Sequence, residues 1–463
     1  MAILFLITAA CQTFATLSIP QAVTKFVAEN NSRGARNVAA SAFFQAARAS
    51  AVLCVPVVIG IYIGASFLAS HLLGDITFTR LFQVLALDVF FYAGVLPLLT
   101  SVLLGLHMYR VTASVGIVCG LLRQFLIIVL ILLLKNLVGL VIGWLLSDAT
   151  TVVVYSVYVL RALGKPRFDF PLVSILRFSL PLNLSNIASY AQNWFDRALL
   201  TLFVPLATLG VYSATLTAFG VLTGIDVAMT NMLYPAFSSI DKSDGKRIAD
   251  AARLGTRYAS FVLIPLTLGL FATARPALTF FVGESYIGGT LPLMMLTGVS
   301  AATLIGTAAL PPVLLAIEET RLSAAITSIS VAISIVAGYV LLPYWGTVGA
   351  ATARALGMIL TATLAIVVLK RKVPLQLDLK ATGKYLIAGT VMAAAAVAAQ
   401  LIMYSSVMLP LYVVIGGAVY LTVLRLLKAV GPADMDLLRG FLGTRLSKLA
   451  DFISWIILPS GEK

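Results

Sequence analysis

Seven charged side chains stand inside long apolar stretches of this sequence. In chain order they are Asp88, Arg123, Asp148, Asp196, Arg197, Asp226 and Arg354. A charge near the middle of a membrane helix costs about 2.5–3.5 kcal/mol on insertion scales, so such a residue usually faces a cavity or a partner on another helix. These residues are therefore the first candidates for a functional site.

Three arginines of this set, Arg123, Arg197 and Arg354, suit the binding of an anionic group. A guanidinium presents its N–H donors in a planar fork that matches the oxygens of a phosphate. We interpret these three residues as cationic ligands in a substrate cavity. The alternative is that each arginine pairs with a nearby aspartate and holds helices together, or extends its charge to the membrane surface.

Other polar side chains could support transport. Asp88, Asp148 and Asp226 could titrate or bind a cation as coupling groups; the alternative is that they are buried carboxylates with hydrogen-bonded or charged partners. A set of amides lies on two apolar runs, at positions Gln12, Gln21, Asn183, Asn186, Gln192 and Asn193. Such amides either bond helices together or line the path of a polar substrate.

No pattern typical of an enzyme or a metal site is present in the sequence. His71 and His107 are the only histidines, and the cysteines Cys11, Cys54 and Cys119 lie in apolar runs outside any CxxC pattern. A GxxxxGK[ST] nucleotide-binding loop is also missing. We predict a protein that is not an enzyme and that binds no metal or cofactor.

The composition predicts an all-α polytopic membrane protein. Apolar residues make up 60% of the 463 residues and charged residues 11%, whereas soluble proteins carry roughly 25% charged residues. Apolar runs of about 20 residues recur along the chain, and such runs form helices in lipid. The net charge of +14 lies mainly in short loops between the runs, so we assign it to membrane topology and predict no nucleic-acid partner.

About thirteen runs are long and apolar enough to cross a membrane. Their predicted spans are 2–24, 46–70, 82–106, 111–134, 137–160, 173–201, 210–235, 255–281, 288–316, 322–342, 347–369, 384–404 and 409–427. Basic residues gather in the loops after the odd-numbered runs, whereas loops 202–209, 343–346 and 405–408 carry no charge. Because basic loops stay inside, we predict a multi-pass protein of the cell (cytoplasmic) membrane with a cytoplasmic C-terminus.

Two parts of the sequence repeat. Residues 48–75 align with 257–284 through a shared R-x7-P-x3-G-x13-G-[DE] pattern, and 104–110 align with 315–321. Both copies run the same way, which predicts two pseudo-symmetric bundles around a central cleft. The run 173–201 has no counterpart in the first half. We therefore predict that a first helix is missing, through a late start codon or a truncation, and that restoring it would give fourteen helices.

The chain end differs from the rest. Between Asp434 and Ile457, apolar residues recur at helical spacing with basic residues between them. This pattern predicts an amphipathic helix on the inner leaflet; the alternative is a frayed soluble tail. The predicted domains are an N-terminal bundle at 1–165, a C-terminal bundle at 166–372, two additional helices at 373–430 and a cytoplasmic tail at 431–463.

Several short sequences resemble one family. Phe178-Ser-Leu-Pro-Leu-Asn-Leu, Asn193-Trp-Phe-Asp-Arg and Leu209-Gly-Val-Tyr-Ser-Ala are similar to the start of the second bundle in polysaccharide and oligosaccharide-lipid flippases. Leu17-Ser-Ile-Pro-Gln-Ala-Val-Thr-Lys-Phe-Val-Ala-Glu resembles the end of their second helix. These proteins, which include the O-antigen flippases, belong to the multidrug/oligosaccharidyl-lipid/polysaccharide exporter superfamily and have twelve to fourteen helices.

The resemblance implies a flippase that moves polyprenyl-phosphate-linked oligosaccharide or polysaccharide precursors from the inner to the outer leaflet by alternating access. The arginines would then bind the phosphate and the amides would line the glycan path. The implied partners are membrane lipids, the lipid-linked glycan and a glycan polymerase or ligase. Two alternatives stay open: a multidrug exporter driven by proton or sodium antiport, and a non-transporting assembly partner or decayed paralogue.

Overall fold

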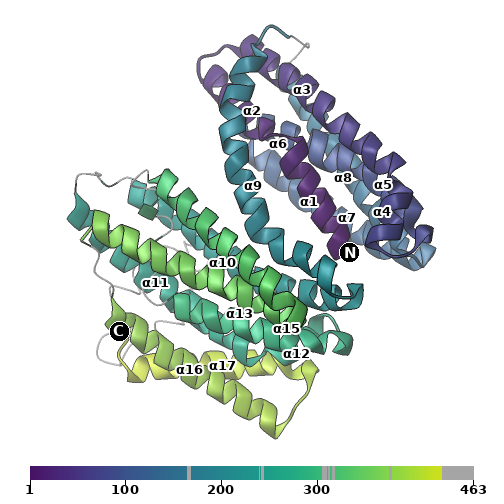
Figure 1. Ribbon diagram of the computed structural model, residues 1–463. Helices are drawn as coiled ribbons and strands as arrows, with labels where there is room; N and C mark the ends of the chain where they lie inside the picture. The colour runs from purple at the N-terminus through teal and green to yellow at the C-terminus, as the bar shows by residue number, and fades with distance from the viewer. Residues whose placement is uncertain are drawn as a thin grey trace. The chain divides into compact units, whose positions relative to one another are not determined.

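The computed structural model describes residues 1–163, 168–238, 244–304, 319–374 and 378–429, together with positions 240, 310, 313 and 314. Every regular element in these ranges is a helix, as the composition predicted. The chain forms two compact units, Met1–Phe195 and Asp196–Lys463. In Figure 1 the first unit runs from purple to teal and the second from teal to yellow.

The first unit contains membrane-length helices and shorter helical pieces. Its elements are α1 (Ala2–Ala15), α2 (Ile19–Ser32), α3 (Arg36–Ile63), α4 (Ala65–Leu72), η1 (Ile76–Phe78), α5 (Thr79–Val89), the π-helical η2 (Phe90–Val95), α6 (Leu96–Gly105), α7 (Tyr109–Leu134), α8 (Leu137–Leu163) and most of α9 (Leu172–Phe203). α1 and α2 meet at 53°, because Leu17 and Ser18 have positive φ values of 46° and 58° at the break. Left-handed backbone costs an L-residue about 1–2 kcal/mol, so contacts from elsewhere must hold this bend.

The second unit starts in the last two turns of α9. Its further elements are α10 (Leu206–Ser238), α11 (Gly245–Ala272), α12 (Ala274–Phe281), η3 (Glu284–Gly289), α13 (Thr290–Thr303), α15 (Thr320–Lys372), α16 (Leu379–Ile402), η4 (Ser406–Met408) and α17 (Leu409–Leu426). α16 and α17 pack on α11, where the rings of Tyr385 and Tyr420 both contact Phe261. The predicted tail at 431–463, with its amphipathic helix at 434–457, lies outside the described residues.

α15 consists of two arms joined at Gly346. This residue has non-helical angles, φ 51° and ψ −124°, which a glycine adopts without a steric penalty. A Cβ on Gly338 would lie 3.7 Å from the Cβ of Ala353, so the two arms run side by side as a hairpin. The predicted runs 322–342 and 347–369 correspond to these arms.

The number of membrane crossings stays a prediction. Nine helices in the described ranges are long and apolar enough to cross a membrane, and the bent pair of α1 and α2 makes a tenth. That count takes α15 as a single helix, and part of the predicted run 288–316 lies outside the described residues. The total of about thirteen is therefore neither confirmed nor contradicted.

The helix lengths agree with the internal repeat predicted from the sequence. α3 and α11 each contain 28 residues, and α4 and α12, which follow them, each contain 8. Pro56 in α3 and Pro265 in α11 are the equivalent prolines of the aligned pattern. The same sequence pattern thus produces the same pair of helices in both units. The central cleft predicted between two bundles stays a prediction.

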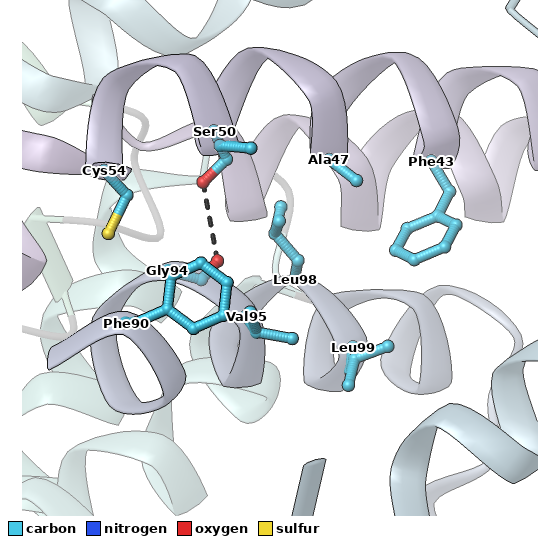
Figure 2. A pocket seen from close by; sticks show the side chains of 10 residues that line it. Phe43, Ala47, Ser50, Cys54, Phe90, Gly94, Val95, Leu98 and Leu99 are labelled. Carbon is cyan, nitrogen blue, oxygen red and sulfur yellow. Dashed lines mark hydrogen bonds between the residues drawn. The ribbon is translucent and has the colours of Figure 1, made fainter. Parts of the chain in front are cut away.

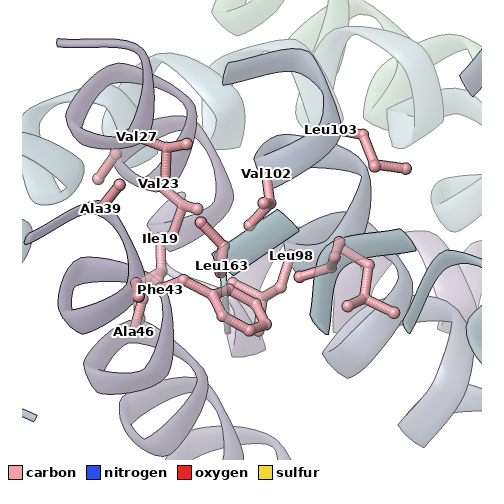
Figure 3. Close-up of a cluster of buried hydrophobic side chains, with 14 of the residues drawn as sticks. Ile19, Val23, Val27, Ala39, Phe43, Ala46, Leu98, Val102, Leu103 and Leu163 are labelled. Carbon is pink, nitrogen blue, oxygen red and sulfur yellow. The ribbon is translucent and has the colours of Figure 1, made fainter. Parts of the chain in front are cut away.

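The core of the first unit lies where α2, α3 and α6 meet. Ile19 and Val23 from α2, Phe43 from α3 and Val102 from α6 are buried there, and Figure 3 shows their side chains pointing toward one another. Ala46, also buried, keeps this part of α3 narrow. Close packing of this kind holds membrane helices together, because lipid tails are as apolar as the side chains themselves.

The division between the units falls inside α9. The first part of this helix packs within the first unit, where the hydroxyl of Tyr190 donates a hydrogen bond to the carbonyl oxygen of Leu6 at 3.3 Å. The units divide between Phe195 and Asp196, whereas the sequence placed a domain boundary at 165. The predicted domain bounds stay predictions.

Candidate functional site

Three of the charged residues predicted from the sequence meet inside the first unit. Asp88 comes from α5, Arg123 from α7 and Asp148 from α8. Nη1 of Arg123 lies 3.5 Å from Oδ1 of Asp148, and Asp88 interacts electrostatically with both residues. Asp88 is fully buried and Asp148 nearly so, whereas 24% of the Arg123 side chain is exposed. The cluster joins two aspartates to one arginine.

The hairpin of α7 and α8 brings Arg123 to Asp148. The chain turns at Lys135, which has φ 50°, and α8 begins at Leu137. A Cβ on Gly139 would lie 2.5 Å from the carbonyl oxygen of Leu130, so glycine is required for the arms to approach this closely. Arg123 and Asp148 stand equally far from the turn along the chain, and they therefore lie at the same level of the hairpin.

Two aromatic rings enclose the guanidinium of Arg123. Its Cζ lies 5.7 Å from the ring centre of Tyr92 and 5.2 Å from that of Trp144. Both distances are typical of cation–π contacts. Tyr92 lies on the π-helical η2, just before Pro97, which has no N–H to continue an α-helical bond pattern. Such π-helical turns often occur at functional sites.

A cavity of about 320 Å³ opens beside this cluster. Its lining residues are Met1, Phe5, Thr8, Asp88, Tyr92, Arg123, Gln124, Ile127 and Trp144. The lining combines a cation, a carboxylate, an amide and a hydroxyl with aromatic rings. This combination suits a ligand that has both polar groups and flat apolar faces.

A second, smaller cavity lies between α3 and the segment formed by η2 and α6. It has a volume of about 90 Å³ and is lined mainly by apolar side chains such as Phe43, Cys54 and Phe90. Ser50 donates a hydrogen bond to the carbonyl oxygen of Gly94 at 3.4 Å, as Figure 2 shows. The one hydroxyl among the side chains that line this cavity is therefore already hydrogen-bonded, and this bond holds η2 against α3.

Of the residues that line the larger cavity, sequence reasoning found Asp88 and Arg123 and missed the others, among them Thr8, Tyr92, Gln124 and Trp144. A usable signal was present, because Tyr92 follows Asp88 by four positions and Trp144 precedes Asp148 by four. Residues four apart lie on the same face of a helix. An aromatic side chain in an apolar run carries no polar signal of its own, so only this spacing from a charged residue marks it.

A second charged cluster lies in the second unit. Nε of Arg354 on α15 donates to Oδ2 of Asp196 at 2.7 Å, and the hydroxyl of Tyr212 on α10 donates to the same oxygen at 2.7 Å. Asp196 and Tyr212 are fully buried, and 16% of the Arg354 side chain is exposed. The geometry of Arg354 matches the alternative of an arginine that pairs with an aspartate and links helices.

Of the remaining charged candidates, Arg197 lies beside the Arg354 cluster and Asp226 lies apart from both charged clusters. The backbone N–H of Arg197 donates to Oδ1 of Asp196 at 2.8 Å, and its side chain is partly buried next to the Arg354 cluster. Asp226 is half-buried on α10 and takes no part in either cluster. Their predicted roles stay predictions.

Two of the amides hold the break between α1 and α2. Ser18 donates to Oδ1 of Asn183 at 3.2 Å and accepts from Nδ2 of Asn186 at 2.8 Å. These contacts explain how the positive φ at Ser18 is retained, and they favour a helix-bonding role for both asparagines. Gln12 is half-buried, and the exposed amides are Gln21, Gln192 and Asn193.

These features define a polytopic α-helical membrane protein with a charged cavity inside its first helical unit. Residues 1–289 match the family described as "Polysaccharide biosynthesis protein", and the chain belongs to that family.

Two curated proteins are similar to parts of the chain. The succinoglycan biosynthesis transport protein ExoT of Rhizobium meliloti is 28% identical over 125 residues, which are 26% of this chain and 25% of that protein. The probable low-salt glycan biosynthesis flippase Agl15 of Haloferax volcanii is 23% identical over 208 residues, which are 44% of this chain and 43% of that protein. The chain thus spans less than half the length of these relatives.

Among solved structures, the lipid II flippase MurJ in its inward closed conformation has a similar fold. The TM-score is 0.70 at 14% sequence identity, and the match covers 91% of this chain and 95% of that one. At this identity the likeness concerns the fold. It confirms the all-α membrane fold predicted from the sequence.

Proposed function

We propose that this protein is a flippase that moves polyprenyl-phosphate-linked oligosaccharide or polysaccharide precursors from the inner to the outer leaflet by alternating access. The observation that carries the proposal is the partly exposed Arg123 guanidinium between two aromatic rings in a cavity, in a chain of the polysaccharide biosynthesis family. The glycan transporters among its relatives support this substrate class.

The chemistry of the cavity matches the parts of such a substrate. A phosphate needs a fixed positive charge where water is scarce, and Arg123 supplies one. The half-buried ring of Tyr92 offers a flat apolar face against which a sugar ring can pack, whereas the Trp144 ring is buried and packs on Phe5 and Arg123. Gln124 and Thr8 add hydrogen-bonding groups for hydroxyls.

Arg123 is a better phosphate ligand than Arg354. Its 3.5 Å contact with Asp148 is longer than the 2.7–2.9 Å of a close charge-assisted hydrogen bond. Arg354 makes such a close bond to Asp196 and is more buried. An incoming phosphate therefore has less to displace at Arg123.

The proposed setting is the cytoplasmic membrane, with basic loops and the C-terminus inside. The last turn of α15 carries Lys370, Arg371 and Lys372, a cluster that stays in the cytoplasm by the positive-inside rule. A glycan polymerase or ligase on the outer side would consume the product. An ion gradient, the membrane potential or that consumption would drive transport.

The test is translocation of a fluorescent polyprenyl-diphosphate oligosaccharide between the leaflets of proteoliposomes. We expect Arg123→Ala to lower the initial rate at least about tenfold, because a hydrogen bond to a charged group contributes about 1.5–3 kcal/mol. Arg123→Lys retains the positive charge, so its initial rate should lie between those of wild type and Arg123→Ala. Arg80→Ala changes an exposed arginine at the start of α5 and serves as the control. Transport that is equal in all variants would refute the site, and transport absent from folded wild-type protein would refute the function.

The two carboxylates beside Arg123 favour one alternative, a multidrug exporter. When both are ionised, Asp88 and Asp148 outnumber the single arginine, and an excess of negative charge beside aromatic rings suits a cationic drug. A cationic dye in the same vesicles, under a proton or sodium gradient, separates the two functions. Dye transport without glycan translocation would support the exporter.

A further inference from the structure

Three carboxylate oxygens in the first unit are buried without a donor. They are Oδ1 and Oδ2 of Asp88 and Oδ2 of Asp148, and none has a hydrogen-bond partner among the described residues. An unmet buried polar group costs about 1–3 kcal/mol, and more when it is charged. Asp88 also lines the 320 Å³ cavity. Something that the side chains do not supply must satisfy these oxygens.

The charges around Asp88 show what is missing. Among the described residues, the titratable groups that act on it are Asp148 on α8, Arg123 on α7 and Tyr92 on η2. The neighbouring helices α1, α3 and α4 also pack on α5. Their titratable groups, none of which acts on Asp88, are the α-amino group of Met1 before α1, Cys11, Arg36, Arg48, Cys54, Tyr62 and His71, and the same holds for Tyr155, Tyr158 and Arg161 on α8. Two carboxylates thus share one cation, which leaves one negative charge in excess.

A single proton removes the excess charge and satisfies two of the three oxygens. As a carboxylic acid, one aspartate gains an O–H that can donate to the other, and the cluster with Arg123 becomes neutral. Two carboxylates that share a site commonly hold one proton between them. A metal ion fits less well, because the described residues contain no group of three or more metal-ligating side chains and Arg123 would repel it.

We propose that Asp88 and Asp148 hold one proton between them, and that this proton binds together with an anionic group on Arg123. Without the proton the cluster carries a net charge of −1 and opposes an anion. With the proton it is neutral, and Asp148 holds Arg123 less strongly. Proton and anion therefore raise each other's affinity by the same factor.

This linkage between proton binding and anion binding extends the proposed function. It rests on that function only for the choice of anion, a polyprenyl-linked phosphate. Where one proton is linked, the affinity for the anion falls by up to about tenfold for each pH unit above the titration of the pair. Neutral side chains at the pair would remove this dependence.

The proton itself is tested without a ligand. Infrared spectra of the purified full chain in detergent, near neutral pH, are compared between wild type and Asp88→Asn. We expect a carboxylic-acid C=O band that the variant lacks, whereas Asp75→Asn, a change at an exposed aspartate before η1, keeps it. A difference spectrum without this band overturns the shared proton, whatever the outcome of the translocation assay.

The linkage is tested by calorimetry with farnesyl diphosphate, a short polyprenyl diphosphate, in buffers of different ionisation enthalpy. We expect wild type to take up more protons for each ligand bound than Asp88→Asn, whose uptake measures the ligand alone. Asp148→Asn removes the partner of Arg123 and should bind the probe more tightly and with less pH dependence, an effect that a purely structural aspartate would not produce.

Each contrary result of the calorimetry has its own meaning. Equal proton uptake in wild type and Asp88→Asn overturns the linkage and leaves the flippase function standing. Tighter binding in sodium with no change across pH also overturns it, in favour of a cation. Failure of folded wild type to bind the probe overturns the linkage too, and the translocation assay then decides on the function separately.

Discussion

The carboxylate of Asp196 accepts the Nε–H of Arg354 at 2.7 Å, inside the second unit. The hydroxyl of Tyr212 donates to the same oxygen, so one carboxylate connects α9, α10 and α15. Removal of one partner from a buried ion pair leaves an uncompensated charge, which costs about 3–5 kcal/mol. We therefore expect Arg354→Ala to lower the free energy of unfolding by that amount, measured by thermal or denaturant unfolding in detergent.

A double substitution separates this pair from a simple loss of volume. Asp196→Leu with Arg354→Met removes both charges and should be less destabilising than the sum of the single changes. Lys372→Ala is the surface control: its 2.6 Å pair with Glu319 involves side chains that are 49% and 29% exposed, and such pairs contribute at most about 1 kcal/mol. Additive single effects would contradict the buried pair.

The α7–α8 hairpin should be sensitive to one methyl group. Gly139→Ala places a Cβ 2.5 Å from the carbonyl oxygen of Leu130, so the arms must separate. We expect a loss of about 1–3 kcal/mol in stability and slower glycan translocation, because Arg123 and Asp148 depend on the same hairpin. Gly120→Ala on α7 is the matched control, since a Cβ there meets no atom within 4 Å. Equal effects of both changes would contradict the close approach.

Trp144 should contribute to substrate binding through its ring. Trp144→Ala removes the buried ring on which the Arg123 guanidinium packs, and we expect an increase of about three- to tenfold in the apparent KM for translocation, equal to about 0.5–1.5 kcal/mol. Trp144→Phe retains a ring and should lose less. Trp345→Ala removes an exposed ring at the α15 turn, and an equal effect there would point to a general loss of folding instead.

The membrane orientation can be measured by cysteine labelling in intact cells. Tyr344 at the α15 turn and Lys246 at the start of α11 are both exposed. In a chain whose native cysteines have been replaced, we expect an impermeant maleimide to label Tyr344→Cys at once. Lys246→Cys should react only after permeabilisation, because its loop is basic. The reverse pattern would invert the topology.

Local patterns were enough to predict that the chain is helical and to mark two pairs of equivalent positions. Hydropathy located the arms on either side of Gly346, and the pattern around Pro56 and Pro265 predicted helices that prove to have equal lengths. Such features depend on short stretches of chain and on the need of the backbone to satisfy its hydrogen bonds in lipid. These features can therefore be predicted from the sequence without knowledge of which helices contact one another.

The candidate site was predictable only in part. Asp88, Arg123 and Asp148 were marked individually, because each is a charge in an apolar run. Their meeting in one cluster, and the pairing of Arg354 with Asp196, were not predictable, and neither was the presence of Tyr92 and Trp144 beside Arg123. The sequence also left the role of Asn183 and Asn186 open between glycan path and helix bonding, and the contacts with Ser18 favour the second.

Hydropathy and residue types were sufficient to identify a helical membrane protein with a repeated sequence pattern and a small set of charges in apolar runs. Which charges share a cavity and which join helices depends on how the helices pack against one another. A membrane helix is apolar on nearly every face, so its sequence says little about how it is rotated toward its neighbours. The turn at Lys135 and the close approach at Gly139 set this rotation. Together they bring Arg123 to Asp148.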